Sequence, residues 1–341
     1  MVTEGRGQSV VTTLREVALH AGVSVSTASR ALSRPELVEE STRRRVLAAA
    51  SHLRYAPNQA GRALSTGRTG AWGMVVPDLR NPFFPGIVKG VQSAAHEAGQ
   101  SLLIVDTDEN PTAEFERVQS LVHQTDAIVL CSSRMTDDEL QRVAARSSLV
   151  LINRAHPALP SVTFDTSAGV REAAEHLRAL GHTRVGYAAG PSHSFSDQER
   201  AASVVAEFVA QGMEVIHLGN FDPSPGGGRK AADRALLANV TAVMAYDDIM
   251  AMGLIGRLQA YGVRVPEKMS VIGWDDIEFS EMFTPSLTTI HLPRERAGEA
   301  AVEVLQRAAG GADVPSMRLD THLVFRQTTA PVPSGVPGAS A

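Results

Sequence analysis

The sequence predicts an all-α head followed by a larger α/β body. Between residues 13 and 53 every periodic segment repeats its apolar residues at helical spacing, whereas beyond Gly70 short apolar strands alternate with amphipathic helices. A chain of 341 residues is long enough for two or three domains. We expect a head at residues 1–56, a linker at 57–69, a body at 70–330 and a disordered tail at 331–341, which is rich in Pro, Gly and Ser.

The first two helices of the head have clear start and stop signals. Thr13 and Glu16 fit a capping box, so a helix should begin there, run to about His20 and stop at Ala21-Gly22. Ser24 is a good N-cap for a second helix, from Val25 to about Leu32.

A third helix is expected from about Thr42 to Leu53. It would bring one set of apolar residues onto a single face: Val46, Leu47, Ala50 and Leu53. Beyond it, Tyr55-Ala56-Pro57-Asn58 breaks the pattern, and Asn58–Leu64 is long enough for one more short helix. Because so short a helix is unstable alone in water, its surroundings must fold it.

The body reads as repeated strand–helix units. The strand candidates are Trp72–Val76, Leu102–Val105, Ala127–Leu130, Leu149–Ile152, Val185–Ala188, Val215–Leu218, Ala242–Ala245 and Ser270–Gly273. The helices between them include Phe83–Glu97, Ala168–Leu180 and Gln198–Gln211. This alternation predicts parallel sheets covered by helices on both faces. Two blocks open alike, at Gly70 and Thr183, which indicates two sheets of similar topology.

Charge is distributed unevenly along the chain. Residues 1–69 hold ten arginines and five glutamates, a net charge of +5, while the whole chain carries -5, so the remaining 272 residues carry -10. A basic head on an acidic body favours a polyanion partner for the head, although basic termini are often merely solvated. No apolar run approaches the roughly 18 residues of a membrane span, and no secretory signal is visible. We therefore expect a cytoplasmic protein that does not bind membranes.

The second predicted helix has the surface of a DNA-reading helix. Val17, Val23, Ala28 and Ala31 face inward, Ala18 is small where two helices cross, and Gly22 permits a tight turn. The outer face carries short hydroxyl side chains, a methyl surface and Arg30. This is the chemistry of a helix-turn-helix in a major groove. The alternative is a plain pair of helices with a polar outer face.

These residues resemble the LacI/GalR family of bacterial transcription regulators. In the head the resemblance rests on Thr13, Ala18, Gly22-Val23-Ser24, Ser26-Thr27, Ser29-Arg30-Ala31-Leu32, Thr42-Arg43, Val46, Tyr55-Ala56-Pro57-Asn58 and Leu64. In the body it continues through Asn81-Pro82-Phe83-Phe84, Leu151-Ile152-Asn153-Arg154, Gly181-His182, Ala189-Gly190-Pro191, Val271-Ile272-Gly273-Trp274-Asp275-Asp276 and Thr284-Pro285-Ser286-Leu287-Thr288-Thr289-Ile290. It covers nearly the whole chain in order.

The resemblance implies that each head reads one half of a palindromic operator. The DNA-binding residues it implies are Ser24, Val25, Ser26, Thr27, Ser29, Arg30, Asn58, Arg62 and Leu64. Asn58–Leu64 matches the family's hinge helix, which folds in the minor groove, and Leu64 matches a leucine wedge that parts the central base step. A lone leucine in a linker can instead pack on the body.

Two residues depart from the family pattern. Gly61 stands where Ala is usual and should weaken the hinge helix by about 1 kcal/mol. Hinge folding should then depend more strictly on specific DNA. Glu39 stands where Ser or Thr usually caps the third helix. Its carboxylate favours the helix dipole but repels a nearby phosphate.

The body resembles the type I periplasmic-binding-protein fold, with a ligand in the cleft between two subdomains. We expect an N-subdomain at about 70–165 and 291–320, and a C-subdomain at about 166–290 and 321–330. Polar and aromatic residues follow the predicted strands, where open α/β sheets bind ligands. The expected effector-binding residues are Phe84, Asp165, Ser194, Ser196, Arg200, Phe221, Asp247, Trp274 and Asp275, and Asn81 and Asn153 lie at equivalent positions. Each can also be an ordinary loop or capping residue, and Asp247 sits where Asn is common.

Enzyme chemistry is not expected. The sequence has no Gly-x-x-x-x-Gly-Lys-Ser/Thr loop, no His-Glu-x-x-His and no Gly-x-Ser-x-Gly, and its 11 histidines are scattered. The single cysteine, Cys131, excludes an internal disulfide and a cysteine-based zinc site. We expect no metal and no cofactor.

The predicted function is a dimeric, sequence-specific repressor that binds operator DNA and is controlled by a sugar-like effector. Two alternatives remain at this stage. A regulator that has lost its effector would keep the head, and a transport-type sugar-binding protein would share the body fold but have no use for the head.

Overall fold

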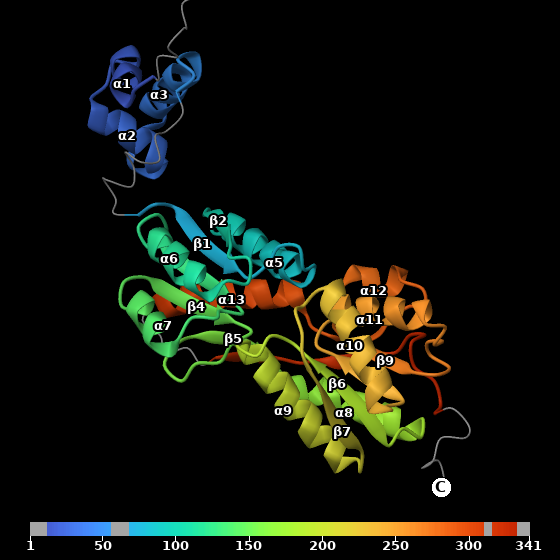
Figure 1. The fold of residues 1–341 in the computed structure, drawn as a ribbon. Coiled ribbons are helices and arrows are strands. Elements are labelled where there is room, and N and C mark those ends of the chain that lie inside the picture. Colours follow the sequence, from blue (N-terminus) through green and yellow to red (C-terminus); the bar gives the residue numbers. More distant parts are fainter. Residues whose placement is uncertain (1–11, 56–67, 310–315, 333–341) are drawn as a thin grey trace, which may run out of the picture. The chain divides into compact units, whose positions relative to one another are not determined.

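The computed structural model describes residues 12–55, 68–309 and 316–332. The expectations for Asn58, Gly61, Arg62 and Leu64, and for the tail beyond residue 332, lie outside these residues. The chain divides into two compact units, Met1–Thr69 and Gly70–Ala341. The first unit contains the all-α head and the second the α/β body, so the predicted fold class is confirmed (Figure 1).

The head is built from three α-helices and one short 3-10 turn among its described residues: α1 (Leu14–Ala21), α2 (Val25–Ser33), η1 (Pro35–Leu37) and α3 (Glu40–His52). The capping box at Thr13 and Glu16 is present. Gly22 ends α1 in the left-handed conformation, with φ +64°, and Ser24 caps α2. These local signals set the angle between α1 and α2, which pack with α3 around Val17 and Ala28.

Two details of α3 differ from the sequence prediction. The helix begins at Glu40, two residues before the expected Thr42, and Glu39 is its N-cap without a side-chain hydrogen bond. Leu47 was expected in the core but is 43% exposed, and Ala49 is buried instead. A small rotation of α3 about its axis, relative to the predicted orientation, keeps Val46 in the core of the head and exposes the larger Leu47 to solvent.

The body contains two six-stranded sheets. The first holds β1 (Ala71–Val76), β2 (Ser101–Asp106), β3 (Ala127–Cys131), β4 (Ser148–Ile152), β5 (Ser161–Phe164) and β11 (Met317–Leu319). The second holds β6 (Arg184–Ala189), β7 (Glu214–Asn220), β8 (Ala242–Ala245), β9 (Ser270–Asp275), β10 (Thr288–His291) and β12 (His322–Val324). Figure 1 shows the two sheets in separate lobes of the body.

The two sheets share one topology. Their strand orders are β11-β5-β4-β3-β1-β2 and β12-β10-β9-β8-β6-β7, so the strand order reverses beside β1 in one and beside β6 in the other. The prediction of two similar sheets is therefore confirmed. The sequence prediction missed β5, β10, β11 and β12, all of them strands of three or four residues. The predicted parallel arrangement is confirmed for most strands, and the short edge strand β12 pairs antiparallel with β10.

Helices cover both faces of each sheet. On the first sheet, α5 (Phe83–Glu97) and α13 (Arg294–Ala309) contribute to one apolar cluster, and α6 (Pro111–Leu121) and α7 (Asp137–Ala144) to another. On the second, α8 (Thr166–Ala179) and α9 (Phe195–Ala210) share the first cluster, while α10 (Pro225–Ala238) and α11 (Asp248–Ala260) form a third. The short α12 (Glu278–Met282) follows β9. Edge strand β2 is an exception to full coverage, because Leu103 and Ile104 are exposed.

The chain crosses between the two sheets three times, after β5, after β10 and after β11. Two of these crossings are tied together by Thr321, whose hydroxyl donates to the Asp165 carbonyl at 2.5 Å and accepts from the Gly169 amide at 3.0 Å. Three separate connections restrict the two lobes to hinge-like movement about the crossings. In the described part of the chain, no helix is both long and apolar enough to span a membrane.

Candidate DNA-binding and effector sites

The exposed face of α2 carries the predicted DNA-reading side chains. Ser24, Val25, Ser26, Ser29 and Arg30 are exposed, whereas Thr27 is half-buried. The Ser24 hydroxyl accepts from the Thr27 amide at 3.1 Å and lies 2.9 Å from the Ser26 hydroxyl. The Arg30 Nε donates to the Ser26 carbonyl at 3.2 Å, so the guanidinium lies along the helix. This face offers hydroxyl groups and one guanidinium, the groups that contact phosphates and guanine.

In the body, a small cavity lies where the two lobes meet. It is lined by Asn81, Phe83, Phe84, Glu109, Ser132, Asn153, Arg200, Pro223, Tyr246, Asp247 and Asp275. Most of these residues follow the carboxyl end of a strand or start the helix after it. Open α/β sheets bind ligands at this edge, beside the point where the strand order reverses. The duplicated topology thus brings two such edges to one place.

Strained backbone is concentrated at this cavity. Four lining residues other than glycine have left-handed φ values: Glu109 at +56°, Ser132 at +48°, Asn153 at +58° and Asp275 at +109°. Such conformations cost about 1–3 kcal/mol each and persist where the surroundings hold them, which is characteristic of ligand sites. The Asn153 amide donates to the Ser132 hydroxyl at 2.9 Å and so joins two of the strained turns.

Arg200 is the buried cation of the cavity lining. It is 3% exposed, donates to the Tyr246 carbonyl at 2.5 Å and to Asp275 at 3.1 Å, and its guanidinium lies 4.7 Å from the ring centroids of both Tyr246 and Trp274. Burial raises the pKa of Asp275 well above its usual range, although Arg200 opposes this. The arginine is therefore fixed by two rings and an ion pair.

Three interactions cross from one lobe to the other beside the cavity. Asn81 donates to Asp247 at 3.1 Å, Arg134 donates to Ser194 at 3.1 Å, and the Arg154 guanidinium lies 3.7 Å from the Phe195 ring centroid. The cavity enclosed in this conformation has a volume of about 10 Å³, close to that of one water molecule. A larger ligand must separate the lobes and replace these contacts.

Four of the nine predicted effector residues line the cavity: Phe84, Arg200, Asp247 and Asp275. Ser194 and Ser196 lie just behind it, within hydrogen-bonding distance of the Tyr246 hydroxyl, at 3.4 Å and 3.1 Å. Trp274 lies against Arg200, and its indole Nε1 is a buried donor that has no hydrogen-bond partner among the described residues.

Asp165 and Phe221 do not line the cavity. Asp165 accepts from Ser167 at 2.7 Å and pairs with Arg318 at 3.1 Å, beside a crossing between the lobes. Phe221 packs against the apolar cluster under α10 and α11. Both positions follow strands, but the Asp165 side chain takes part in an ion pair and the Phe221 side chain in packing.

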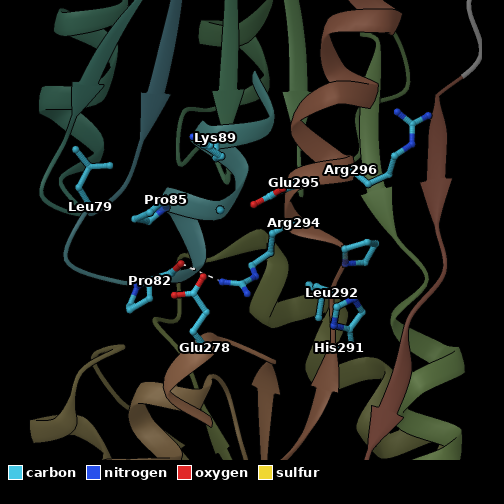
Figure 2. A pocket seen from close by; sticks show the side chains of 12 residues that line it. Leu79, Pro82, Pro85, Lys89, Glu278, His291, Leu292, Arg294, Glu295 and Arg296 are labelled. Atoms are coloured by element: carbon cyan, nitrogen blue, oxygen red, sulfur yellow. Dashed lines mark hydrogen bonds between the residues drawn. The ribbon is translucent and has the colours of Figure 1, made fainter. Parts of the chain in front are cut away.

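A second, larger hollow of about 680 Å³ lies between the starts of α5 and α13 (Figure 2). Three of its six ionisable side chains have partners in the described part of the chain. Arg294 donates to the carbonyls of Pro82 and Asp276, His291 pairs with Asp276, and Arg296 pairs with Glu303. We therefore place the candidate effector site in the inner cavity, where polar groups and strained backbone converge. Among the described residues, no group of three or more His, Cys, Asp or Glu side chains is arranged to hold a metal.

Comparison with known proteins identifies the family. Residues 13–58 match the model of bacterial regulatory proteins of the lacI family, and residues 174–329 match a periplasmic-binding-protein-like domain. The transcriptional regulator GalR of Salmonella typhimurium is 35% identical over 327 residues, which cover 93% of this chain and 94% of that protein. The chain belongs to the lacI family.

Solved structures of lacI-family proteins share both the head and the body. The lac repressor dimer bound to operator and the anti-inducer ONPF has a TM-score of 0.85 and 28% identity, covering 94% of this chain and 99% of that one. The complex of the transcriptional regulator CelR with cellobiose has a TM-score of 0.67 and 30% identity, covering 93% and 99%. These relatives are regulators, which confirms that this lacI-family chain is a DNA-binding regulator and not an enzyme.

Sequence reasoning missed five lining residues of this lacI-family protein: Phe83, Glu109, Ser132, Pro223 and Tyr246. Ser132 and Tyr246 directly follow β3 and β8, so the rule that selected Asn153 and Asp247 could have found them. Glu109 gave no such signal, because its place in the cavity depends on an unusual turn at Asp108 and Glu109, both with positive φ.

A neighbouring carboxylate gives the body a specific pH dependence. Asp248 is fully buried and accepts from Thr289 at 2.5 Å, Ser280 at 2.6 Å and the Ile277 amide at 2.9 Å. Burial raises its pKa to about 7, although these hydrogen bonds oppose the rise. In the unfolded chain the pKa is about 3.9, so between pH 4 and 7 the folded state binds more protons. The contribution of Asp248 to stability is therefore greatest at low pH and declines as pH rises to 7.

Replacing Asp248→Asn should remove this dependence, since Asn keeps one acceptor and cannot ionise. As the pH rises from 5 to 8, we expect the free energy of unfolding of the variant to increase relative to that of the wild type. The increase should be a few kcal/mol at most, because one pKa unit corresponds to about 1.4 kcal/mol. Urea unfolding at both pH values measures the difference, with Asp138→Asn, which removes an exposed carboxylate of α7, as control. An equal wild-type-to-variant difference at both pH values would contradict the account.

Proposed function

We propose that this protein is a transcriptional repressor that binds a palindromic operator as a homodimer and is controlled by a sugar-like effector in the inner cavity. The observation that carries the proposal is the presence, in one lacI-family chain, of a helix-turn-helix head and a cavity between two hinged lobes. The cavity joins one guanidinium, several hydroxyl or amide groups and aromatic rings, a mixture suited to the hydroxyls and C–H faces of a sugar. The protein then acts where the chromosome is, in the cytoplasm.

In the proposed mechanism, effector binding changes how the lobes close. The ligand replaces the contacts from Asn81 to Asp247 and from Arg134 to Ser194, and the three crossings convert this into movement of one lobe relative to the other. In a dimer that movement changes the spacing of the two heads. Effector and operator then alter each other's affinity by the same factor, as linkage requires.

Each head reads one operator half-site through Ser24, Val25, Ser26, Thr27, Ser29 and Arg30 of α2 and its cap. The proposal extends to Asn58, Arg62 and Leu64 of the linker, with the leucine as a wedge at the operator centre. Effector binding is assigned to Phe84, Arg200, Asp247 and Asp275, with Ser194, Ser196 and Trp274 supporting them.

The homodimer is supported by exposed apolar side chains on the body. Leu237 is 82% exposed and Met282 is 67% exposed, and Phe279, Tyr261 and Leu103 are also exposed. A solved relative, the lac repressor, is a dimer on its operator. We expect a second copy of the chain to cover these side chains, and sedimentation equilibrium should give twice the mass of the 36.2 kDa chain. A monomer at micromolar concentration, with operator bound one head at a time, would contradict the dimer.

A thermal-shift screen tests control by an effector. Sugars, sugar derivatives, nucleosides and their phosphates are each added to the full-length protein. A ligand at a hundredfold excess over its Kd stabilises by about 2.7 kcal/mol. We expect at least one compound to stabilise the body and to change operator affinity in a parallel anisotropy titration. No stabilising compound would favour a regulator that binds DNA without an effector, and a stabilising sugar without operator binding would favour a transport-type binding protein.

A further inference from the structure

The inner cavity has an uncompensated carboxylate. Three carboxylates line it, those of Glu109, Asp247 and Asp275. Arg200 forms an ion pair with Asp275, and Arg134 forms one with Glu109. Among the described residues, Asp247 forms no ion pair within 4 Å. The cavity therefore has one more negative than positive charge when all of these groups are ionised.

The hydrogen bonds of Asp247 come from neutral groups. Its Oδ1 accepts from the Met250 amide at 2.7 Å, as the N-cap of α11, and its Oδ2 accepts from the Asn81 side chain at 3.1 Å. The side chain is 1% exposed. A carboxylate accepts about four hydrogen bonds, so positions on both oxygens are still open. Because Asn81 belongs to the opposite lobe, separation of the lobes removes one of the two present donors.

The surroundings of Asp247 are acidic. The carboxylates of Glu109, Asp248 and Asp275 interact electrostatically with it, and Asp248 is hydrogen-bonded but forms no ion pair within 4 Å in the described body. Burial raises the pKa of Asp247 to about 6 and Glu109 adds to the rise, while the Met250 amide, Arg200 and Asn81 oppose it. At neutral pH the carboxylate is thus mostly ionised, inside a cavity where an unpaired charge is costly.

We propose that the effector carries a positively charged amino group, on a hydroxyl-rich scaffold such as an amino sugar, and that this ammonium binds Asp247. This inference rests on the proposed function, because it names the ligand class of the same cavity. An ammonium has three donors and one positive charge, which matches the open acceptor positions and the missing charge of Asp247. The remaining hydroxyls of the ligand then have Arg200, Asn153 and Ser132 as partners.

The same charge distribution disfavours acidic effectors. A sugar phosphate or uronic acid would bring a second anion close to Asp247, and Arg200 and Arg134 already have carboxylate partners. A neutral sugar would leave the aspartate without a counter-charge in a closed cavity. The difference in affinity between ligands that differ in charge but share one sugar scaffold therefore measures the effect of the charge at Asp247.

Matched sugars test the inference with the full-length protein. The 2-amino-2-deoxy forms of glucose, galactose and mannose are compared with the neutral parent sugars and their 6-phosphates by calorimetry at pH 7.5. We expect at least one amino sugar to bind about tenfold or more tightly than its neutral parent, as a charge-assisted hydrogen bond implies. Its affinity should decline below pH 6, where Asp247 becomes protonated while the amine stays charged.

The variant Asp247→Asn isolates the charge. Asn also caps helices well, so the Met250 amide keeps its acceptor and the fold is retained. We expect the preference for the amino sugar to disappear in this variant, and to remain in the control Asp138→Asn, which removes an exposed carboxylate from α7.

Two different experimental outcomes would contradict the amino-sugar inference alone or the inference together with the proposed function. Neutral or phosphorylated sugars that bind as tightly as the amino sugars, or a preference that persists in Asp247→Asn, would overturn the inference and leave the effector site standing. Failure of every compound in the screen to bind would overturn both.

Discussion

Replacing Arg200→Leu should destabilise the body by about 3–5 kcal/mol and abolish the response to effector. The substitution leaves Asp275, which is 2% exposed, as a buried carboxylate without its ion pair. Breaking a buried pair by removing one partner has this large cost because the remaining charge is not compensated. It also removes the donor to the Tyr246 carbonyl, which orders the turn before Asp247.

A double variant separates stability from ligand binding. Arg200→Leu combined with Asp275→Asn leaves no unpaired charge, so most of the lost stability should return. The effector response should stay absent, because the guanidinium and carboxylate that hold the ligand hydroxyls are both gone. Urea unfolding gives the first result, and titration with the best compound of the thermal-shift screen gives the second. An effector response like that of the wild type in the double variant would show that the site lies elsewhere.

Replacing Arg30→Ala should weaken specific operator binding by about 1–3 kcal/mol while the head stays folded. Arg30 is exposed on α2 and, among the described residues of the head, its side chain donates only to the Ser26 carbonyl, so little folding energy depends on it. A guanidinium that grips a guanine edge contributes about this much discrimination against other bases.

The outcome for Arg30 depends on which groups of the DNA it contacts. If it reads a base, the variant tolerates changes at one symmetric pair of operator positions. If it contacts only phosphate, affinity declines for all sequences and the salt slope decreases by about one. Anisotropy titrations at several salt concentrations distinguish these cases, with Arg229→Ala on α10 as a charge-matched control in the body. Unchanged affinity and unchanged salt slope would contradict the assignment of α2 as the reading helix.

Local signals explain why the head and most strands could be predicted from the sequence. The capping box at Thr13, the left-handed Gly22 and the cap at Ser24 act within a few residues, so the sequence shows them directly. Leu47 was misplaced because its exposure depends on the rotation of α3 against two other helices. The missed strands β5 and β10 to β12 have three or four residues each and are stabilised by pairing with distant strands.

The candidate site was predictable in part for the same reason. Asp247 and Asp275 follow the rule for residues at strand ends, and the resemblance supplied the others, Arg200 among them. What the sequence did not show is which charges pair with each other around the cavity. The ion pair between Arg134 and Glu109 joins separate turns, and the isolation of Asp247 depends on it. Such pairing is a property of the folded cavity.

The most direct test of the central claim is selection of bound sites from a random pool of DNA duplexes, at a salt concentration of about 150 mM because phosphate contacts weaken with salt. We expect enrichment of a palindrome of about 14 to 20 base pairs, with a deformable pyrimidine–purine step at its centre. Enrichment of no sequence, or of a single half-site without symmetry, would contradict a dimeric operator-binding regulator.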